Sequence, residues 1–282
     1  MLHTQDVLST IQASILDLRN SEKKVAEYVL RHPEEVMKSS ITTLAENAGT
    51  SEPTVIRFCR QIKLSGFMDL KLKLAQSLPR ARQDLENVGY DDPVPEIVNK
   101  MFQSAEETIG NTHRHLNMAD VEKAVALLSK AERIEFYGAG GAGILALDAQ
   151  HKFFRLGIPC IAYTDSHMQS MSAALLGPSH VVVAFSHSGA TKDTIESAGI
   201  AKENGAGVIG IQGETKTPLS KYCDIVLASH SEEVALRLAP MASRLAQLAI
   251  VDCLLVAVAH KGGNRIDGNL ARVKQVLIGK RY

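Results

Sequence analysis

Residues 181–211 read VVVAFSHSGATKDTIESAGIAKENGAGVIGI, and this stretch decides the fold class of the C-terminal half of the chain. It holds two short, apolar, β-rich runs separated by a helix-like segment. Counted along the whole chain, five such runs lie at Ile134–Tyr137, Cys160–Tyr163, Val181–Phe185, Val208–Ile211 and Ile225–Leu227. Uniformly apolar strands that alternate with helices are typical of a parallel sheet covered on both faces. The sequence therefore predicts an α/β three-layer sandwich with a five-stranded parallel sheet.

The loop after the third run is rich in hydroxyl side chains. In parallel sheets, ligands bind at the carboxyl ends of the strands. Hydroxyls and backbone N–H groups at a helix N-terminus donate to phosphate oxygens, and hydroxyls do so without adding charge. We therefore expect a phosphate site formed by Ser186, His187, Ser188 and Thr191, with a helix starting near Thr191. The alternative is an ordinary capped helix.

The loop after the first run is rich in glycine, from Gly138 to Gly143. A glycine-rich turn that enters a helix is an anion site, and we expect Gly140, Gly141 and Ala142 to contribute to it. The pattern is formally G-x-G-x-x-G, and Asp165 lies at about the distance expected for a ribose contact. An NAD-binding fold therefore stays open, as does a purely structural need for the glycines.

The N-terminal part reads as successive helices up to residue 78. We expect one helix capped by Ser21 and ended by Pro33, one from about Thr42 to Ala48, one starting near Ser51, and one over about 66–78. Between the second and third helices, Gly49 supplies the positive φ of a tight turn, and Pro53 is tolerated in the first turn of the next helix. Leu44, Ala45, Val55 and Phe58 return to the core. This spacing predicts a helix-turn-helix, with a generic αα-hairpin as the alternative.

The third of these helices is expected to expose residues suited to DNA. Ser51, Thr54, Arg57 and Gln61 are placed on its outer face, where such side chains suit base edges. Arg60, Lys63 and Lys71 suit phosphates. The chain as a whole is neutral, with 31 basic and 31 acidic residues, so DNA binding depends on this local basic surface.

The length of 282 residues favours two domains. We expect an all-α domain over residues 1–79, a polar linker over 80–96, and the α/β domain over 97–282, whose first helix carries an apolar face of Val98, Phe102, Ala105, Ile109 and Leu116. The four cysteines form no C-x-x-C pair, so neither a disulfide nor a zinc framework is expected, which suits the cytoplasm. No signal peptide is visible. The apolar run Leu248–Ala259 contains Asp252 and is interpreted as a buried helix, so no membrane partner is expected. No metal or cofactor is expected either.

Two stretches carry a family resemblance. Residues 10–78, with LAENAGTSEPTVIRFCRQIKLSGFMDLKLKLA at 44–75, resemble the N-terminal domain of RpiR-type bacterial transcriptional regulators. Residues of about 120–260, with FYGAGGAG, AQHKFFRLG and PLSKYCDIVLAS beside the opening stretch, resemble the sugar isomerase (SIS) domain. RpiR-type regulators join these two domains in this order. The resemblance implies that the third helix reads DNA and that Ser186, Ser188 and Thr191 hold a phosphate.

The resemblance also implies a function. The chain is most similar to a subgroup of these regulators whose effector, 2-keto-3-deoxy-6-phosphogluconate, relieves repression. A homodimer or a dimer of dimers on a pseudo-palindromic operator is expected. That subgroup carries a Gly-x-Gly-x-Ser-Gly pattern in the first loop, whereas this chain has Ala142 in place of the serine and so lacks one hydroxyl of that pattern.

Two other functions stay open at this point. One is a sugar-phosphate isomerase with an accessory helical domain, for which His151 or His187 would be the acid–base group, although we expect no enzymatic activity. Arg237, Ser243 and Arg244 are candidates to reach the sugar, whereas Glu232 and Glu233 are interpreted as surface acids. The other is an NAD-responsive redox regulator.

Overall fold

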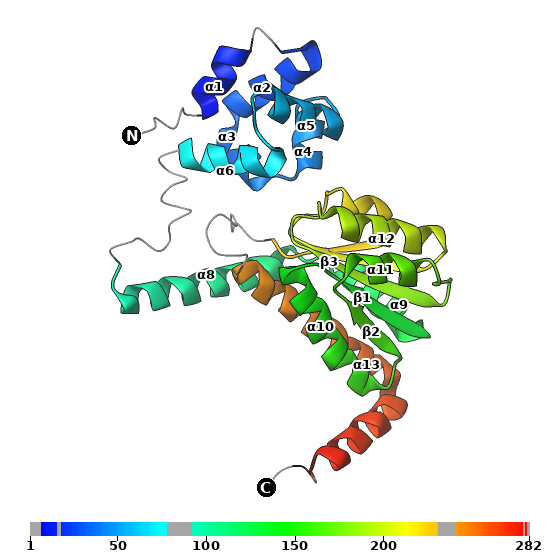
Figure 1. Ribbon diagram of the computed structural model, residues 1–282. Helices are drawn as coiled ribbons and strands as arrows, with labels where there is room; N and C mark the ends of the chain where they lie inside the picture. Colours follow the sequence, from blue (N-terminus) through cyan, green and yellow to red (C-terminus); the bar gives the residue numbers. More distant parts are fainter. Residues whose placement is uncertain (1–6, 16–17, 78–91, 231–240, 279, 281–282) are drawn as a thin grey trace. The chain divides into compact units, whose positions relative to one another are not determined.

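The computed structural model describes residues 7–15, 18–77, 92–230, 241–278 and 280 (Figure 1). The chain divides into two compact units: a helical unit that includes residues 1–104, and a sheet unit formed by residues 105–231 and 241–282. Of the predicted linker at 80–96, residues 80–91 lie outside the described residues, and a helix begins at Val94.

The helical unit consists of short helices packed around an aliphatic core. Their bounds are α1 Val7–Ser14, α2 Asn20–Arg31, α3 Pro33–Lys38, α4 Ile41–Asn47, α5 Glu52–Gln61 and α6 Phe67–Ser77. Leu44, Val55 and Phe58 are fully buried, as predicted from their spacing. The predicted cap at Ser21 is wrong, because α2 begins at Asn20 with Arg19 as its N-cap. Pro33 follows the end of α2 as predicted, but it also opens the short helix α3, since proline is tolerated in a first turn.

The turn between α4 and α5 has the predicted chemistry. Gly49 has a φ of 61°, which favours glycine. Ser51 is the N-cap of α5, and Pro53 lies in the first turn. The Ser51 hydroxyl lies 3.0 Å from the Thr54 hydroxyl and accepts no backbone N–H at the helix end. The chain thus turns sharply between two helices that share one core.

The sheet unit contains five parallel strands in the order β2-β1-β3-β4-β5. Their bounds are β1 Arg133–Tyr137, β2 Cys160–Tyr163, β3 His180–Ser186, β4 Gly207–Gln212 and β5 Ile225–Ala228. The remaining helices are α8 Val94–His115, which belongs to this unit from residue 105 onward, α9 Met118–Lys130, α10 Gly141–Phe153, α11 Ser166–Ala173, α12 Lys192–Glu203 and α13 Ala242–Ile278. One sheet face packs against α9, α10 and α13 and the other against α11 and α12, so the predicted three-layer sandwich is confirmed (Figure 1).

Helix α13 is long and apolar enough, by length and composition alone, to cross a membrane. In the sheet unit, however, its Ile250, Val251, Leu254 and Val258 are buried in the core against the strands. The helix is also interrupted at Gly263, whose φ of 51° and ψ of −143° are not helical. These contacts are those of a core helix, in agreement with the interpretation of Leu248–Ala259.

Helix α8 differs from the expectation. The predicted helix exists, but Val98, Phe102 and Ile109 of its apolar face are exposed. The buried side chains of α8 are instead Thr108 and Thr112. The Thr112 hydroxyl donates to the Ser229 carbonyl oxygen at 2.7 Å and fastens the end of α8 just beyond β5. Among the described residues, the apolar periodicity therefore marks an exposed stripe of α8 and not its buried side.

Candidate functional site

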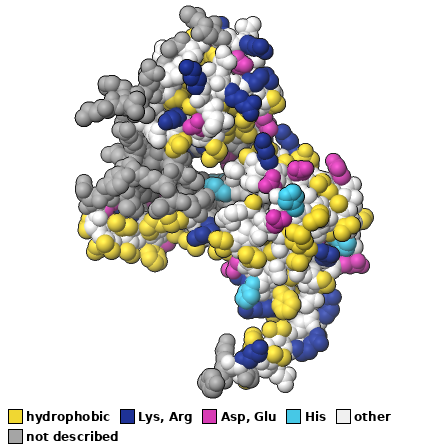
Figure 2. All heavy atoms as spheres, viewed as in Figure 1, with side chains coloured by type: hydrophobic (Ala, Val, Ile, Leu, Met, Phe, Trp, Pro, Cys, Tyr) yellow, Lys and Arg dark blue, Asp and Glu magenta, His cyan; other side chains and the backbone are white. Residues whose placement is uncertain are grey.

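Helix α5 presents polar and basic side chains on its outer surface. The exposed polar and basic side chains just before, on and just after this helix include Ser51, Arg57, Arg60, Gln61 and Lys63. Lys and Arg side chains also gather on the visible face of the helical unit (Figure 2). An exposed helix of this composition, placed after a tight turn, suits the major groove of DNA.

Thr54 departs from the expectation. The prediction placed it on the outer face, but it is 4% exposed, because it lies one helical turn before Phe58 and faces the same core. Its hydroxyl accepts a hydrogen bond from the Arg57 guanidinium at 2.8 Å. Thr54 thus orients Arg57, which is the exposed residue of the two.

A second side chain that holds Arg57 was not predicted from the sequence. Glu22 of α2 is nearly buried, and its carboxylate lies 3.9 Å from Arg57 Nε. The backbone N–H of Arg19 donates to the other carboxylate oxygen at 3.1 Å. A glutamate at the third position of a helix was visible in the sequence, but its approach to α5 depends on how α2 and α5 cross.

Lys71 is more constrained than a phosphate-binding lysine on an open face. Its ammonium donates to the Ser39 carbonyl oxygen at 2.9 Å and lies 5.6 Å from the centroid of the Phe67 ring. Lys71 therefore joins the start of α6 to the end of α3. The Lys71 side chain is half-buried, whereas that of Lys63 is exposed.

In the sheet unit, the two predicted anion loops follow neighbouring strands. β1 and β3 pair in parallel, with Tyr137 opposite Ala184. The chain moves from β1 to β2 on one side and continues from β3 to β4 on the other. Ligands of open α/β sheets bind at such a switch point, in the crevice beyond the carboxyl ends of the strands. Both loops follow the carboxyl ends of the two strands at this switch point.

The β3–α12 loop brings its hydroxyls together. Ser186 is 2% exposed, and its Oγ lies 3.1 Å from Thr191 Oγ1. The Thr191 side chain does not cap α12. Ser188 is exposed, and its Oγ accepts the backbone N–H of Ala190 at 3.2 Å, while the half-buried His187 has its carbonyl bonded to the Gly213 N–H at 2.8 Å. The four predicted residues thus lie in one loop at the start of α12.

The loop after β1 contains glycines that packing requires and one glycine, Gly141, that packing does not require. A Cβ on Gly138 would lie 2.5 Å from the Ala142 carbonyl oxygen, and one on Gly143 would lie 2.9 Å from the Thr164 side chain. Gly140 has a φ of 57°. Gly141 has ordinary backbone angles and nothing within 4 Å of its Cβ position. Part of the glycine pattern is thus explained by packing, and the exposed Gly141 leaves space where α10 begins.

Two buried polar groups beside these loops were not predicted. Gln169 of α11 is fully buried and donates to the carbonyl oxygens of Gly138 and Tyr163, at 3.2 and 2.8 Å, so it positions the β1 loop. Its Oε1 has no hydrogen-bond partner among the described residues. Thr194, in the first turn of α12, is also fully buried, and its hydroxyl has no partner within the described part of the chain. Neither residue belongs to a recognisable motif. Their burial depends on how α11 and α12 pack, which the local sequence does not show.

The other candidates are placed apart from these loops or lie outside the described residues. His151 is exposed near the end of α10 that is distant from Gly141, with its ring near Arg155. Ser243 is buried in α13, and Arg244 is half-buried. Glu232, Glu233 and Arg237 lie outside the described residues. Within the described ranges, no group of His, Cys, Asp or Glu side chains is arranged to hold a metal ion.

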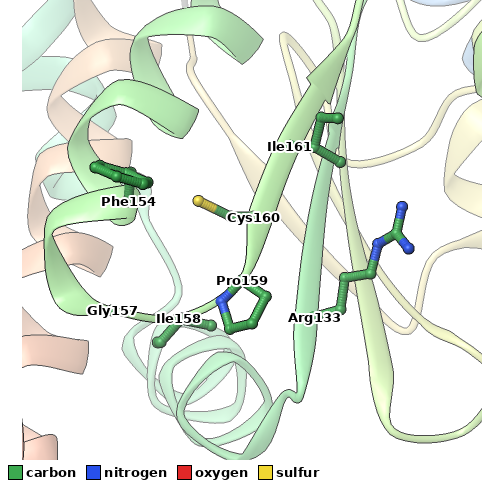
Figure 3. Close-up of a pocket in the computed structure, with 7 residues that line it drawn as sticks. All are labelled: Arg133, Phe154, Gly157, Ile158, Pro159, Cys160 and Ile161. Atoms are coloured by element: carbon green, nitrogen blue, oxygen red, sulfur yellow. The ribbon is translucent and has the colours of Figure 1, made fainter.

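A cavity of about 510 Å³ lies at the opposite edge of the sheet (Figure 3). It is lined by Arg133, Phe154, Gly157, Ile158, Pro159, Cys160 and Ile161, at the amino ends of β1 and β2. Figure 3 shows the Arg133 side chain on the other side of the strands from Phe154 and Cys160, so these groups do not converge on a shared ligand position. The paired hydroxyls of Ser186 and Thr191 lie instead at the carboxyl end of β3.

Known proteins resemble this chain in both sequence and structure. The helix-turn-helix domain of the rpiR family matches residues 5–81, and the SIS domain matches residues 127–257. The regulator HexR of Escherichia coli is 38% identical over 98% of this chain and 96% of its own length, and HexR of Pseudomonas aeruginosa is 36% identical over 99% and 98%. HexR is the subgroup expected from the sequence. The solved structure of Vibrio vulnificus NanR complexed with ManNAc-6P aligns with a TM-score of 0.85 at 26% identity, covering 98% of this chain and 99% of that one.

These likenesses span both units of the chain. The chain belongs to the RpiR family of DNA-binding transcriptional regulators, which join a helix-turn-helix domain to a sugar-phosphate-binding SIS domain.

Proposed function

We propose that this protein is a cytoplasmic repressor of hexose catabolism that leaves its operator when it binds 2-keto-3-deoxy-6-phosphogluconate. The DNA-binding residues are Ser51, Arg57, Arg60, Gln61, Lys63 and Lys71, with Thr54 orienting Arg57. The effector's phosphate lies against Ser186, Ser188 and Thr191, with His187 and the backbone of Gly140, Gly141 and Ala142 nearby. The functional domains are residues 1–79 and 97–282, and the last residues of the linker at 80–96 form the start of α8.

The observation that carries the effector site is the pair of hydroxyls at 3.1 Å between Ser186 and Thr191. They lie where a strand meets the N-terminus of a 12-residue helix. The first N–H groups of a helix and its dipole favour an anion at that position. A phosphate there would accept bonds from both hydroxyls.

The alternative functions find less support in the site. The strand order 2-1-3-4-5 differs from the order 3-2-1-4-5-6 of NAD-binding Rossmann folds. For isomerisation, residues 138–143 and 186–191 include His187 but no Asp or Glu that could act with it as an acid–base pair. His151 lies away from both loops. We therefore propose binding without turnover.

The complex of NanR with ManNAc-6P raises a second candidate effector. Ala142 in place of the expected serine is the observation in its favour, because it removes a hydroxyl from the first loop. Both effectors carry a phosphate, so the β3–α12 loop suits either of them. Discrimination between the two effectors therefore depends on contacts to the part of each molecule that is not phosphate.

A titration of both effectors against the protein on its operator tests these proposals. We expect 2-keto-3-deoxy-6-phosphogluconate to release DNA at lower concentration than N-acetylmannosamine 6-phosphate, and each to raise the melting temperature if it binds. NMR of the same mixtures should show no isomerised product. Release by N-acetylmannosamine 6-phosphate alone would identify that compound as the effector. Turnover at enzymatic rates would favour an isomerase over a regulator that binds without turnover. A homodimer or dimer of dimers on a pseudo-palindromic site is part of the proposal.

A further inference from the structure

The exposed apolar surface of α8 follows one helical stripe. Val94, Val98, Phe102 and Ile109 are 72%, 48%, 68% and 40% exposed and recur at spacings of four or seven residues. Figure 2 shows hydrophobic side chains gathered along this helix. We name this stripe, together with Met101, the α8 face. Contiguous exposed apolar surface is typical of contact sites.

A second apolar stripe lies after the break at Gly263. Ile266, Leu270, Val273 and Leu277 recur every three or four residues, and their burial falls along the stripe. Ile266 is 1% exposed, the next two residues are half-buried, and Leu277 is 43% exposed. We name residues 264–278 the α13 tail. Its own unit covers only the beginning of the stripe.

The two surfaces carry opposite charge. Residues 94–109, which carry the α8 face, hold three acidic side chains against Lys100, whereas the α13 tail holds three basic side chains against Asp267. Packing the α8 face on a second α8 face would bring like charges together, and so would packing tail on tail. Packing the tail on the α8 face neutralises both surfaces.

The anchor points of the two surfaces lie at opposite edges of the sheet. Thr112 of α8 bonds to Ser229, just beyond the carboxyl end of β5. Asn269 of the tail donates to the Leu156 carbonyl oxygen at 2.8 Å, shortly before the amino end of β2. A two-fold axis that runs two copies antiparallel brings each edge of one copy beside the other edge of the second.

We propose that in the homodimer the α13 tail of each copy packs on the α8 face of the other. The contact is made twice and is identical on both sides of the two-fold axis. It joins the helix that leads into the helical unit to the sheet unit of the second copy. This interface rests on the homodimer of the proposed function.

Cross-linking of full-length protein tests the pairing. In a Cys253→Ser background, which removes the exposed thiol, Phe102→Cys and Leu277→Cys are combined and treated with a short bis-maleimide. We expect a covalent dimer from the double variant and none from either single variant. A cross-linked monomer, a dimer from Phe102→Cys alone, or no cross-link would each overturn the proposal.

A charge exchange gives an independent readout. Glu106 and Lys274 flank the two stripes, one beside the α8 face and the other on the α13 tail. Glu106→Lys should weaken dimerisation about tenfold at low salt, and adding Lys274→Glu should restore it. Glu203→Lys, which changes an exposed acid on α12, is the matched control and should leave the dimer unchanged.

Sedimentation equilibrium measures the unmodified protein and these three variants. Failure of the second substitution to restore the dimer would contradict the pairing. Operator binding and effector release are measured on the same proteins. A correct cross-link in a protein that binds no operator would reject the regulatory function and leave the interface standing.

Discussion

The Arg57 guanidinium lies 3.9 Å from the carboxylate of Glu22, a nearly buried residue on another helix. Together with the bond to Thr54, this contact fixes an exposed cation of α5 before any DNA arrives. A side chain that is already ordered loses less conformational entropy on binding than a mobile one. The arrangement therefore favours Arg57 as a reader of a base over a mobile phosphate contact.

Arg57→Ala should weaken operator binding by about 1–3 kcal/mol if Arg57 contacts a base. Arg31→Ala, which removes an exposed arginine at the end of α2, is the control and should change affinity little. Fluorescence anisotropy at fixed salt measures both, with a melting curve to confirm folding. Equal operator affinity for folded Arg57→Ala and the unmodified protein would remove Arg57 from the interface.

Lys71→Ala should have two effects. Loss of the bond to the Ser39 carbonyl should lower the stability of the helical unit by about 1 kcal/mol. Loss of the charge should weaken binding to any DNA sequence and reduce the slope of log affinity against log salt by about one. Lys71→Met, which keeps the length of the side chain, helps to separate the two. An unchanged salt slope in both variants would show that Lys71 has a structural role only.

Ser186→Ala should weaken effector binding about tenfold to a hundredfold, because a hydrogen bond to a charged group is worth roughly 1.5–3 kcal/mol. Operator affinity without effector should stay unchanged. Ser197→Ala is a matched control, since the Ser170 and Ser197 hydroxyls also lie 3.1 Å apart but outside the two loops. Effector is titrated against each DNA complex. Release of Ser186→Ala at the unmodified protein's effector concentration would place the phosphate elsewhere. Ala142→Ser is expected to tighten the response.

Burial, and then the hydrogen bond to Glu135, raise the pKa of Tyr137 above its ordinary value. The folded protein therefore keeps the phenolic proton at a pH where the unfolded chain loses it. The contribution of the protonated Tyr137 to the free energy of unfolding is fully present below about pH 10. Above that pH it falls by about 1.4 kcal/mol per pH unit. Urea unfolding from pH 9 to 11 should show a shallower decline for Tyr137→Phe. Parallel pH profiles for the two proteins would contradict this assignment.

Gly157→Ala should destabilise the sheet unit by at least about 1 kcal/mol. Gly157 has a φ of 74°, and its Cβ would lie 2.3 Å from the Asn269 amide nitrogen. Gly177→Ala is the control, because its Cβ position is empty and its φ is not positive. Thermal unfolding compares the two variants. Equal melting temperatures would show that the Asn269 side chain moves away from the added Cβ without loss of stability.

Periodicity and turn chemistry predicted the elements that depend on local sequence. The five strands, the turn at Gly49 and the hydroxyl loop after β3 follow from patterns within a few residues of one another. The prediction for Thr54 is wrong because both faces of α5 carry polar residues, and only the packing of α5 on its neighbours decides which face is buried. Glu22, Gln169 and Thr194 were not predicted for the same reason. Their surroundings are formed by segments far apart in the chain.

The two glycines nearest the anion loops have different evolutionary freedom. A side chain on Gly189 would place its Cβ 2.1 Å from Thr217 Oγ1, in a backbone conformation that only glycine adopts readily. Gly141 faces open space, and the neighbouring Ala142 already differs from the serine of the HexR pattern. Heritable changes in effector preference would therefore accumulate in the β1 loop, while the β3–α12 loop, the proposed phosphate site, stays fixed. A lineage can thus acquire a response to a new metabolite and keep the same phosphate anchor.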